Sequence, residues 1–181
     1  GRALTPAATT AAGQDAYVVD FSATTGTNNR WHTELVKPVK YANRAAQAAK
    51  LLTYTSAALT ADLDIIGHPT VELRLMSTHD DGAVYVYLES VSPDGTVRYL
   101  ADAQLRLIHR AESSAPYWVG GVYHPCSRAA SAPFPINQWQ TIRLTLSALA
   151  VRVPRGDALR LALAGHDAET FRRYPAVGTP T

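Results

Sequence analysis

Residues 77–110 constrain the fold of this chain more than any other stretch. Val84 and Val86 alternate there with Tyr85 and Tyr87. A period of two is typical of a β-strand, whose successive side chains point to opposite faces. We therefore predict a strand with valines on one face and tyrosines on the other.

A turn and two further strands are predicted after this strand. Pro93-Asp94-Gly95 supplies turn chemistry, because proline presets φ and glycine accepts a positive φ. Residues 97–100 then run back as a strand, and residues 105–110 are predicted to form the next one.

The same alternation recurs further along the chain. Apolar side chains occupy every second position in three more segments: Val71, Leu73 and Leu75; Ile142, Leu144 and Leu146; and Leu159, Leu161 and Leu163. Short strands at such spacing favour an antiparallel β-sandwich. The long connection 111–138 favours Greek-key or jelly-roll crossings over a simple meander. We therefore predict an all-β fold.

The first fifty residues carry weaker signals. Residues 1–13 are rich in alanine and threonine and are predicted to be linker, and residues 17–21 are compatible with an isolated strand. Residues 43–50 have helical propensity that is marginal without tertiary support. We therefore divide the chain into a linker with an irregular N-terminal extension, residues 1–50, and a β domain, residues 51–181.

Composition excludes several classes of function. The net charge is only +2 and no run of Lys or Arg occurs, whereas nucleic-acid binding needs concentrated positive charge. The longest apolar runs fall far short of a membrane span, so we expect neither a nucleic-acid nor a membrane partner. Cys126 is the only cysteine, which rules out an intrachain disulfide and leaves both a cytoplasmic and a secreted location in a bacterium open. Because the chain starts Gly-Arg-Ala, we expect it to be a piece of a longer protein.

Several segments follow one another in the order found in a known family. They are residues 52–56, 59–67, 69–75, 77–110, 135–144, 153–161 and 173–175. Over residues 51–175 the chain closely resembles the C-terminal domain of the CocE/NonD serine hydrolases, similar to cocaine esterase and X-prolyl dipeptidyl peptidase. Asp157 stands where relatives often have histidine, Ala103 where they commonly have glycine, and Arg173-Tyr174-Pro175 varies a closing Arg-Asn-Pro.

This resemblance implies a jelly-roll β-sandwich of the galactose-binding-like kind. It also implies a non-catalytic accessory domain that packs on the α/β-hydrolase domain of the same protein and helps to shape its substrate pocket. Such domains often take part in oligomer contacts, which leaves a homo-oligomer open. The parent enzyme would hydrolyse an ester, or an amide such as an X-Pro peptide, as an esterase, acylase or dipeptidyl peptidase without a cofactor.

The nucleophile of such a hydrolase is missing from the sequence. An α/β-hydrolase presents its serine in Gly-x-Ser-x-Gly, because the strained turn needs small neighbours. No serine in this chain has that context, and the βαβ alternation that would carry it is absent. We therefore predict no catalytic residue here and expect the parent's Ser, Asp and His to lie outside the chain.

Other groups of residues point only weakly to a nucleophile or a metal site. His124-Pro125-Cys126 places an imidazole near the only thiol, but no Gly-rich turn for an oxyanion is adjacent. His79-Asp80-Asp81, and His166-Asp167 with Glu169, could hold a structural calcium, yet neither has the spacing of a strong metal motif. We predict solvated or turn-capping carboxylates there, and no metal site.

Six residues are predicted to lie at a domain interface or pocket rim: His79, Asp80, Asp81, Tyr85, Tyr87 and Trp118. The first three crowd together without an obvious cation, and we expect their loop, residues 77–82, at the end of the sandwich that faces the catalytic domain. The three aromatic residues are expected to contribute to an exposed apolar patch. Arg106 is expected to pair with an aspartate, because a buried guanidinium must be paired.

Two alternatives remain open at this level. One is a free-standing carbohydrate-binding module, in which Trp31, Trp118, Trp139, Tyr85 and Tyr87 form a platform for stacking sugars. The other is a metal-dependent enzyme.

Overall fold

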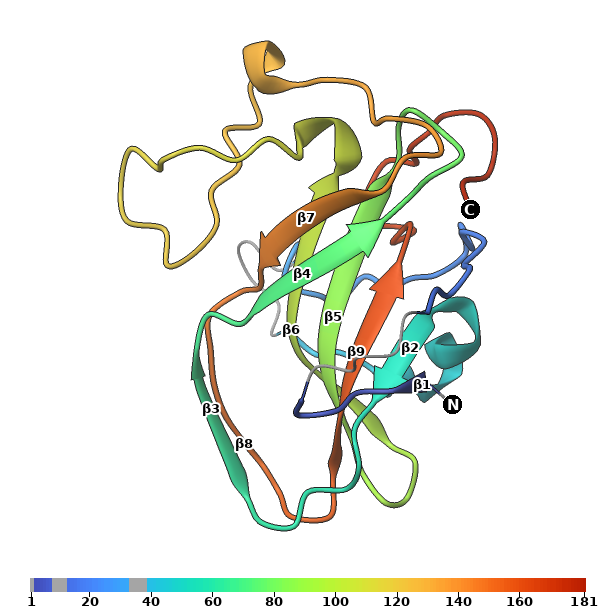
Figure 1. The fold of residues 1–181 in the computed structure, drawn as a ribbon. Helices are drawn as coiled ribbons and strands as arrows, with labels where there is room; N and C mark the ends of the chain where they lie inside the picture. The colour runs from blue at the N-terminus through green and yellow to red at the C-terminus, as the bar shows by residue number, and fades with distance from the viewer. Residues whose placement is uncertain (1, 8–12, 33–38) are drawn as a thin grey trace.

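The computed structural model describes residues 2–7, 13–32 and 39–181, and its regular structure is almost entirely β (Figure 1). The strands are β1 (Arg2–Ala3), β2 (Leu52–Thr55), β3 (Leu63–Gly67), β4 (Thr70–Leu75), β5 (Ala83–Val91), β6 (Val97–Arg106), β7 (Gln140–Thr145), β8 (Leu149–Val153) and β9 (Ala158–Ala164). Short 3₁₀ helices are η1 (Arg44–Lys50), η2 (Leu107–His109) and η3 (Arg128–Ala130). The predicted all-β class is confirmed. No helix in the described ranges has the length and apolar character needed to cross a membrane.

The strands pair in a nested order. β5 pairs with β6, β4 with β7, β3 with β8 and β2 with β9, all antiparallel. Contacts between β5 and β9 complete a five-stranded sheet of order β1-β2-β9-β5-β6, in which β1 runs parallel to β2. The chain therefore folds back along itself as one long antiparallel ribbon.

The hairpin between β5 and β6 forms where the turn was predicted. Gly95 has a φ of 83°, the left-handed conformation that favours glycine. Its backbone N–H donates to the Ser92 carbonyl at 2.9 Å, and the Asp94 carboxylate accepts from the Thr96 backbone N–H at 2.9 Å. These bonds accompany the pairing of Val91 with Val97 beside the turn, and a β-bulge between Leu88 and Glu89 then shifts the register so that Tyr85 lies opposite Gln104.

Two predictions of local structure are wrong. Residues 105–110 are not a separate strand, because β6 continues unbroken to Arg106 and Leu107 then donates its backbone N–H to the Gly82 carbonyl, where η2 begins. Residues 17–21 do not form a strand, although Val19 hydrogen-bonds to the Pro180 carbonyl. A short segment with alternating apolar and polar side chains does not form a β-ladder unless the edge of another strand lies beside it.

The main core lies between the five-stranded sheet and the β4–β7 pair. Its buried members come from both layers and from the connection between them: Val84, Val86, Ala101, Ala103, Leu105, Leu107, Phe134, Ile142, Leu144 and Leu146. The predicted valine face of β5 therefore points into this core. Figure 1 shows β4 and β7 crossing in front of the sheet.

The opposite face of the sheet is covered by the chain's own ends. Ala23 from the N-terminal extension, Leu51 just before β2 and Phe171 from the C-terminal tail pack on Tyr85 and Tyr87. In Figure 1 the blue N-terminal segment passes behind the sheet. The described part of the extension thus packs against the β domain, while the boundary at residue 50 stays a prediction.

The segment with helical propensity forms η1, a 3₁₀ helix. Asn43 caps it, since its side chain accepts from the Ala45 backbone N–H at 3.0 Å. The tertiary support that this short segment needs comes from Arg44, which is buried and pairs with Glu89.

Candidate functional site

Three loops meet at one end of the molecule, at the top of Figure 1, which we call the loop end. They are residues 76–82 between β4 and β5, residues 128–139, which are the last part of the connection between β6 and β7, and the tail 165–181. Asn137 donates its backbone N–H to the Ser77 carbonyl at 2.8 Å. The Thr78 backbone N–H donates to the Thr181 carbonyl at 3.3 Å, and the Thr181 N–H donates to the Thr78 hydroxyl at 3.2 Å. These bonds hold segments that are far apart in sequence in one fixed surface.

The polar residues of the 77–82 loop have different partners. Asp81 accepts two hydrogen bonds from Arg106, at 3.0 and 2.6 Å, which confirms the predicted ion pair and supplies the cation that the sequence did not show. The His79 ring packs so closely on Gly178 that a Cβ at that glycine would collide with it. The Asp80 side chain is exposed. Two of these three polar side chains of the loop therefore contact other parts of the domain, and the loop is not a cluster of unpaired acidic groups.

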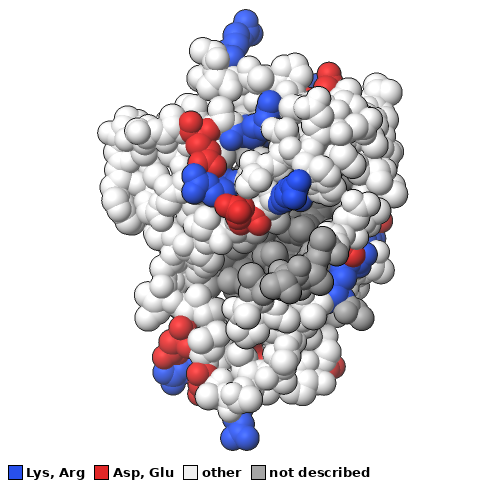
Figure 2. Space-filling view, in the orientation of Figure 1, with Lys and Arg blue, Asp and Glu red and all other residues white. Residues whose placement is uncertain are grey.

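Large apolar side chains are exposed around the loop end. Met76 is 39%, Ile136 49%, Trp139 43% and Val177 83% exposed. A β-bridge between Ser77 and Ile136 brings two of these segments side by side. Figure 2 shows that the visible face is mostly uncharged, with Lys, Arg, Asp and Glu scattered over it. Several exposed apolar groups on adjoining loops are typical of an interaction surface.

The predicted aromatic interface residues separate into two groups. Tyr85 is 4% and Tyr87 2% exposed, so the expectation that they contribute to an exposed patch is wrong. The Tyr85 ring lies 5.2 Å from Phe171, and the Arg44 guanidinium sits 4.4 Å above the Tyr87 ring. Trp118 is 82% exposed, as expected.

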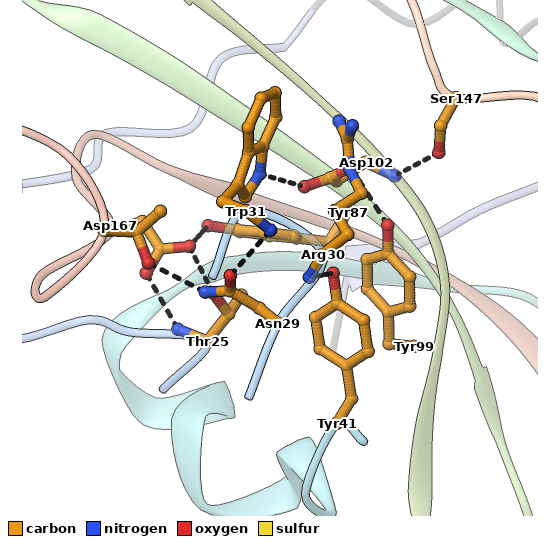
Figure 3. Close-up of polar contacts among 11 residues, drawn as sticks. Thr25, Asn29, Arg30, Trp31, Tyr41, Tyr87, Tyr99, Asp102, Ser147 and Asp167 are labelled. Atoms are coloured by element: carbon orange, nitrogen blue, oxygen red, sulfur yellow. Dashed lines mark hydrogen bonds and ion pairs between the residues drawn. The ribbon is translucent and has the colours of Figure 1, made fainter. Parts of the chain in front are cut away.

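A buried network around Asp167 fixes the N-terminal extension to the sheet (Figure 3). Its carboxylate accepts from the Thr25 backbone N–H at 2.8 Å, the Thr25 hydroxyl at 2.7 Å and the Tyr87 hydroxyl at 2.9 Å. The Asn29 amide donates to the Thr25 hydroxyl at 2.8 Å and to the Thr170 hydroxyl at 2.7 Å. These bonds replace the water that a buried carboxylate has lost. Burial and the neighbouring Asp167 also raise the pKa of Tyr87 well above its ordinary value.

A second buried carboxylate, Asp102, is the other anchor (Figure 3). It accepts from the Arg30 guanidinium at 2.6 Å, the Tyr99 hydroxyl at 3.0 Å and the Trp31 indole at 3.4 Å. Tyr41 stacks on Tyr99 with ring centroids 3.7 Å apart. Both aspartates are engaged by several donors from the chain itself, so we interpret them as structural anchors rather than general acids or bases.

A third buried polar side chain, His166, lacks such partners. Its ring packs edge-on against Phe21 at 5.4 Å, and its Nδ1 has no hydrogen-bond partner among the described residues. Burial lowers the pKa of His166 below 6.5, Arg173 adds to this effect, and Asp167 opposes it. The folded chain therefore favours the neutral imidazole.

We expect His166 to make the domain sensitive to mild acid. Its stabilising contribution is complete above the ordinary histidine pKa and is lost as the pH falls through the lowered pKa of the folded state, because the unfolded chain binds the proton more readily. His166→Phe should flatten the decline in unfolding free energy below about pH 6.5. His32→Phe, at an exposed histidine, should not. Urea unfolding at several pH values measures this, and equal acid slopes for His166→Phe and the unmodified chain would contradict it.

The described residues form no nucleophile pair. The histidine side chains that meet a hydroxyl, His32 and His79, meet threonines, and none is hydrogen-bonded to a described serine or cysteine. His124 has its ring nitrogens 3.1 Å from the Ala111 carbonyl and 2.9 Å from the Arg143 carbonyl, while Cys126 is exposed. No group of three His, Cys, Asp or Glu residues able to hold a metal occurs in the described ranges.

Two cavities in the described structure are equally unlike a substrate site. The larger, of about 440 Å³, is an open depression over β3 and β8, where Arg152 is already paired with Asp64. The smaller, of about 220 Å³, lies between Tyr85, Arg106, Phe171 and Tyr174, below the roughly 300–1,000 Å³ of ordinary ligand pockets. Arg106 stacks 3.8 Å from the Tyr174 ring and is already paired with Asp81. It therefore offers no free charge to a ligand.

The aromatic residues considered for sugar stacking do not share a surface in the described structure. Trp31 packs edge-on against Phe171 at 5.3 Å, and Arg74 sits 5.4 Å above the Trp139 ring. Trp118 contacts His68 at 5.7 Å. No observation favours a carbohydrate-binding platform.

Comparison with protein families matches residues 3–181 to the X-Pro dipeptidyl-peptidase C-terminal non-catalytic domain. The chain belongs to this family. Two relatives, one from Mycobacterium bovis and one from Mycobacterium tuberculosis, are provisionally named serine esterases. Each is 41% identical over 167 residues, which cover 90% of this chain and 27% of the relative. This X-Pro dipeptidyl-peptidase C-terminal domain thus spans about a quarter of the length of these relatives.

Solved hydrolase structures contain the same fold. An aminopeptidase from a marine-sediment Thaumarchaeota archaeon has a TM-score of 0.65 at 16% identity and covers 88% of this chain and 26% of its own. An α-amino acid ester hydrolase gives 0.58 at 20% identity, over 71% of this chain and 20% of its own. A CocE/NonD family hydrolase from Staphylococcus aureus gives 0.58 at 12% identity, over 74% and 26%. The resemblance to the CocE/NonD hydrolases is confirmed.

Proposed function

We propose that this non-catalytic domain packs on the α/β-hydrolase catalytic domain of the same protein and shapes its substrate pocket. The parent protein then hydrolyses an ester or an X-Pro peptide with a serine nucleophile that lies outside the chain. The observation that carries this proposal is the match of residues 3–181 to a non-catalytic domain of such hydrolases. Among the described residues no histidine ring is hydrogen-bonded to a serine hydroxyl, which supports the proposal.

The finer topology that we propose is a jelly roll of the galactose-binding-like kind. Its support is the nested pairing of β5 with β6, β4 with β7, β3 with β8 and β2 with β9. A long antiparallel ribbon that rolls up in this way produces the two layers of a jelly roll.

The loop end is our proposed docking surface for the catalytic domain. Met76 and Ile136 supply apolar contact there, and His79, Asp80 and Asp81 supply a polar rim. An apolar centre with a polar edge is the usual composition of an interface between domains. A homo-oligomer stays a prediction.

Labelling with a fluorophosphonate probe tests the proposal on three forms of the protein. They are this chain alone, the full protein that contains it, and the full protein without these residues. We expect no labelling of the chain, because acyl transfer needs a nucleophile, a base and an oxyanion hole together. The full protein should be labelled at a serine outside the chain, and the shortened form should turn over p-nitrophenyl acetate or an X-Pro anilide more slowly. Stoichiometric labelling of the chain itself, or unchanged turnover by the shortened form, would overturn the proposal.

A further inference from the structure

The connection between η2 and η3, residues 110–127, is long and contains neither strand nor helix. Ordered connections of this length are uncommon unless they have a function. Hydrogen bonds nevertheless fix it to the neighbouring strand β7. The Val122 backbone N–H donates to the Thr145 hydroxyl at 2.9 Å, and the Arg143 guanidinium pairs with Glu112. We call this segment the aromatic arm.

Two glycines allow the aromatic arm to pack closely against the rest of the domain. Gly120 has a φ of 72° and lies on the His68 ring, where a Cβ would approach Nε2 to 2.8 Å. A Cβ at Gly121 would come closer still to the Thr145 side chain. Because neither position accepts a side chain without displacing its neighbour, the arm has one well-defined path.

The fixed path holds two large aromatic rings in solvent. Tyr117 is 67% and Trp118 82% exposed. Each meets the edge of another ring, with centroids 6.2 Å apart for Tyr117 and Tyr123 and 5.7 Å apart for Trp118 and His68. Tyr and Trp are the residues that most often dominate binding energy in interfaces, because they bury much surface and lose little conformational freedom. A loop that is held in one conformation loses little entropy on binding, so the arm with these two rings at its tip is pre-organised for a partner.

Charge indicates the chemistry of the partner. Residues 113–123, Ser-Ser-Ala-Pro-Tyr-Trp-Val-Gly-Gly-Val-Tyr, contain no charged side chain. Charged groups at an interface mainly speed up association, as with transient partners and nucleic acids. The cores of lasting interfaces are instead enriched in uncharged aromatic side chains. The tip therefore fits an apolar pocket with hydrogen-bond acceptors for the indole and phenol groups.

We propose that the Tyr117–Trp118 tip inserts into an apolar pocket on the catalytic part of the same protein. This inference rests on the proposed function, and it adds a second anchor outside the loop end. The chain covers 27% of its relatives, so most of such a protein lies outside these residues. A covalently linked partner is present at high effective concentration, which favours it over a second copy of the protein.

Hydroxyl-radical footprinting with mass spectrometry tests this inference. Trp118 should oxidise rapidly in this chain alone and be strongly protected in the full protein at every protein concentration. Ile66, which is 82% exposed on β3, is the reactive control, and Phe134 is the buried one. Trp118→Ala in the full protein should lower the midpoint of thermal unfolding, and Trp118→Phe should restore part of the loss.

The possible outcomes separate this inference from the proposed function. Protection that rises with protein concentration would instead assign the arm to a second copy, and equal reactivity in both forms would show that nothing covers it; either result overturns the inference. Met76 and Ile136 report on the loop end in the same experiment. If they are protected and Trp118 is not, docking through the loop end stands and the arm inference falls. If none is protected, both proposals fail.

Discussion

Glu89→Ala is expected to destabilise this domain by about 3–5 kcal/mol, because it would leave two buried guanidinium groups without a counter-charge. Glu89 is fully buried, and its two carboxylate oxygens accept from Arg44 and Arg160, which are 4% and 6% exposed. Arg44 also lies over the Tyr87 ring. The loss is a large share of the roughly 5–15 kcal/mol that stabilises an ordinary domain.

Urea unfolding of the chain measures this effect, and Arg44→Met is the matched control. That variant removes a charge from the same cluster but leaves Glu89 paired with Arg160, so the remaining ions compensate each other and the loss should be smaller. Glu89→Gln keeps the volume and two polar atoms and should fall between them. A loss for Glu89→Ala no larger than for Arg44→Met would mean that the site is hydrated and that this account of it is wrong.

The strand pattern around β5 was predictable because it depends on neighbouring residues alone. Alternation placed Val84 and Val86 on one face and Tyr85 and Tyr87 on the other, and both assignments are confirmed. It could not reveal what covers the tyrosine face. The cover is held by polar contacts between distant residues, such as Thr25 and Asp167, which are 142 positions apart in the chain. No local period records contacts of this kind.

The candidate site was predictable to a similar extent. The pattern of residues 77–110 pointed to the 77–82 loop, and Arg106 was expected to pair with an aspartate, as it does with Asp81. No pattern in the sequence singles out Met76, Ile136 and Val177. Each stands alone in a loop sequence, and their proximity arises only when three connections meet. Isolated apolar residues in polar loops were the available signal, but exposed single apolar residues are common on any protein surface.

Phe134→Ala is expected to cost about 3–5 kcal/mol, as truncation of a buried aromatic ring in a core usually does. Phe134 is 1% exposed and belongs to the main core, although it lies in the long connection between β6 and β7. Its backbone N–H donates to the Asp80 carbonyl at 2.7 Å, so the buried ring fixes a residue whose backbone ties that connection to the 77–82 loop. The variant should therefore loosen the loop end as well as destabilise the fold.

Trp118→Ala is the matched control for Phe134→Ala, because it removes a larger ring from the same connection at an exposed position. In the isolated chain it should change the unfolding free energy by no more than about 0.5 kcal/mol, as surface substitutions usually do. Hydrogen exchange of residues 111–139 should quicken in Phe134→Ala well before global unfolding and stay unchanged in Trp118→Ala. If both variants lose stability equally, the arm contributes to the fold itself, and its exposed rings cannot be assigned to a partner. If only Phe134→Ala does, one residue of the connection holds the loops in place while another is left available for binding.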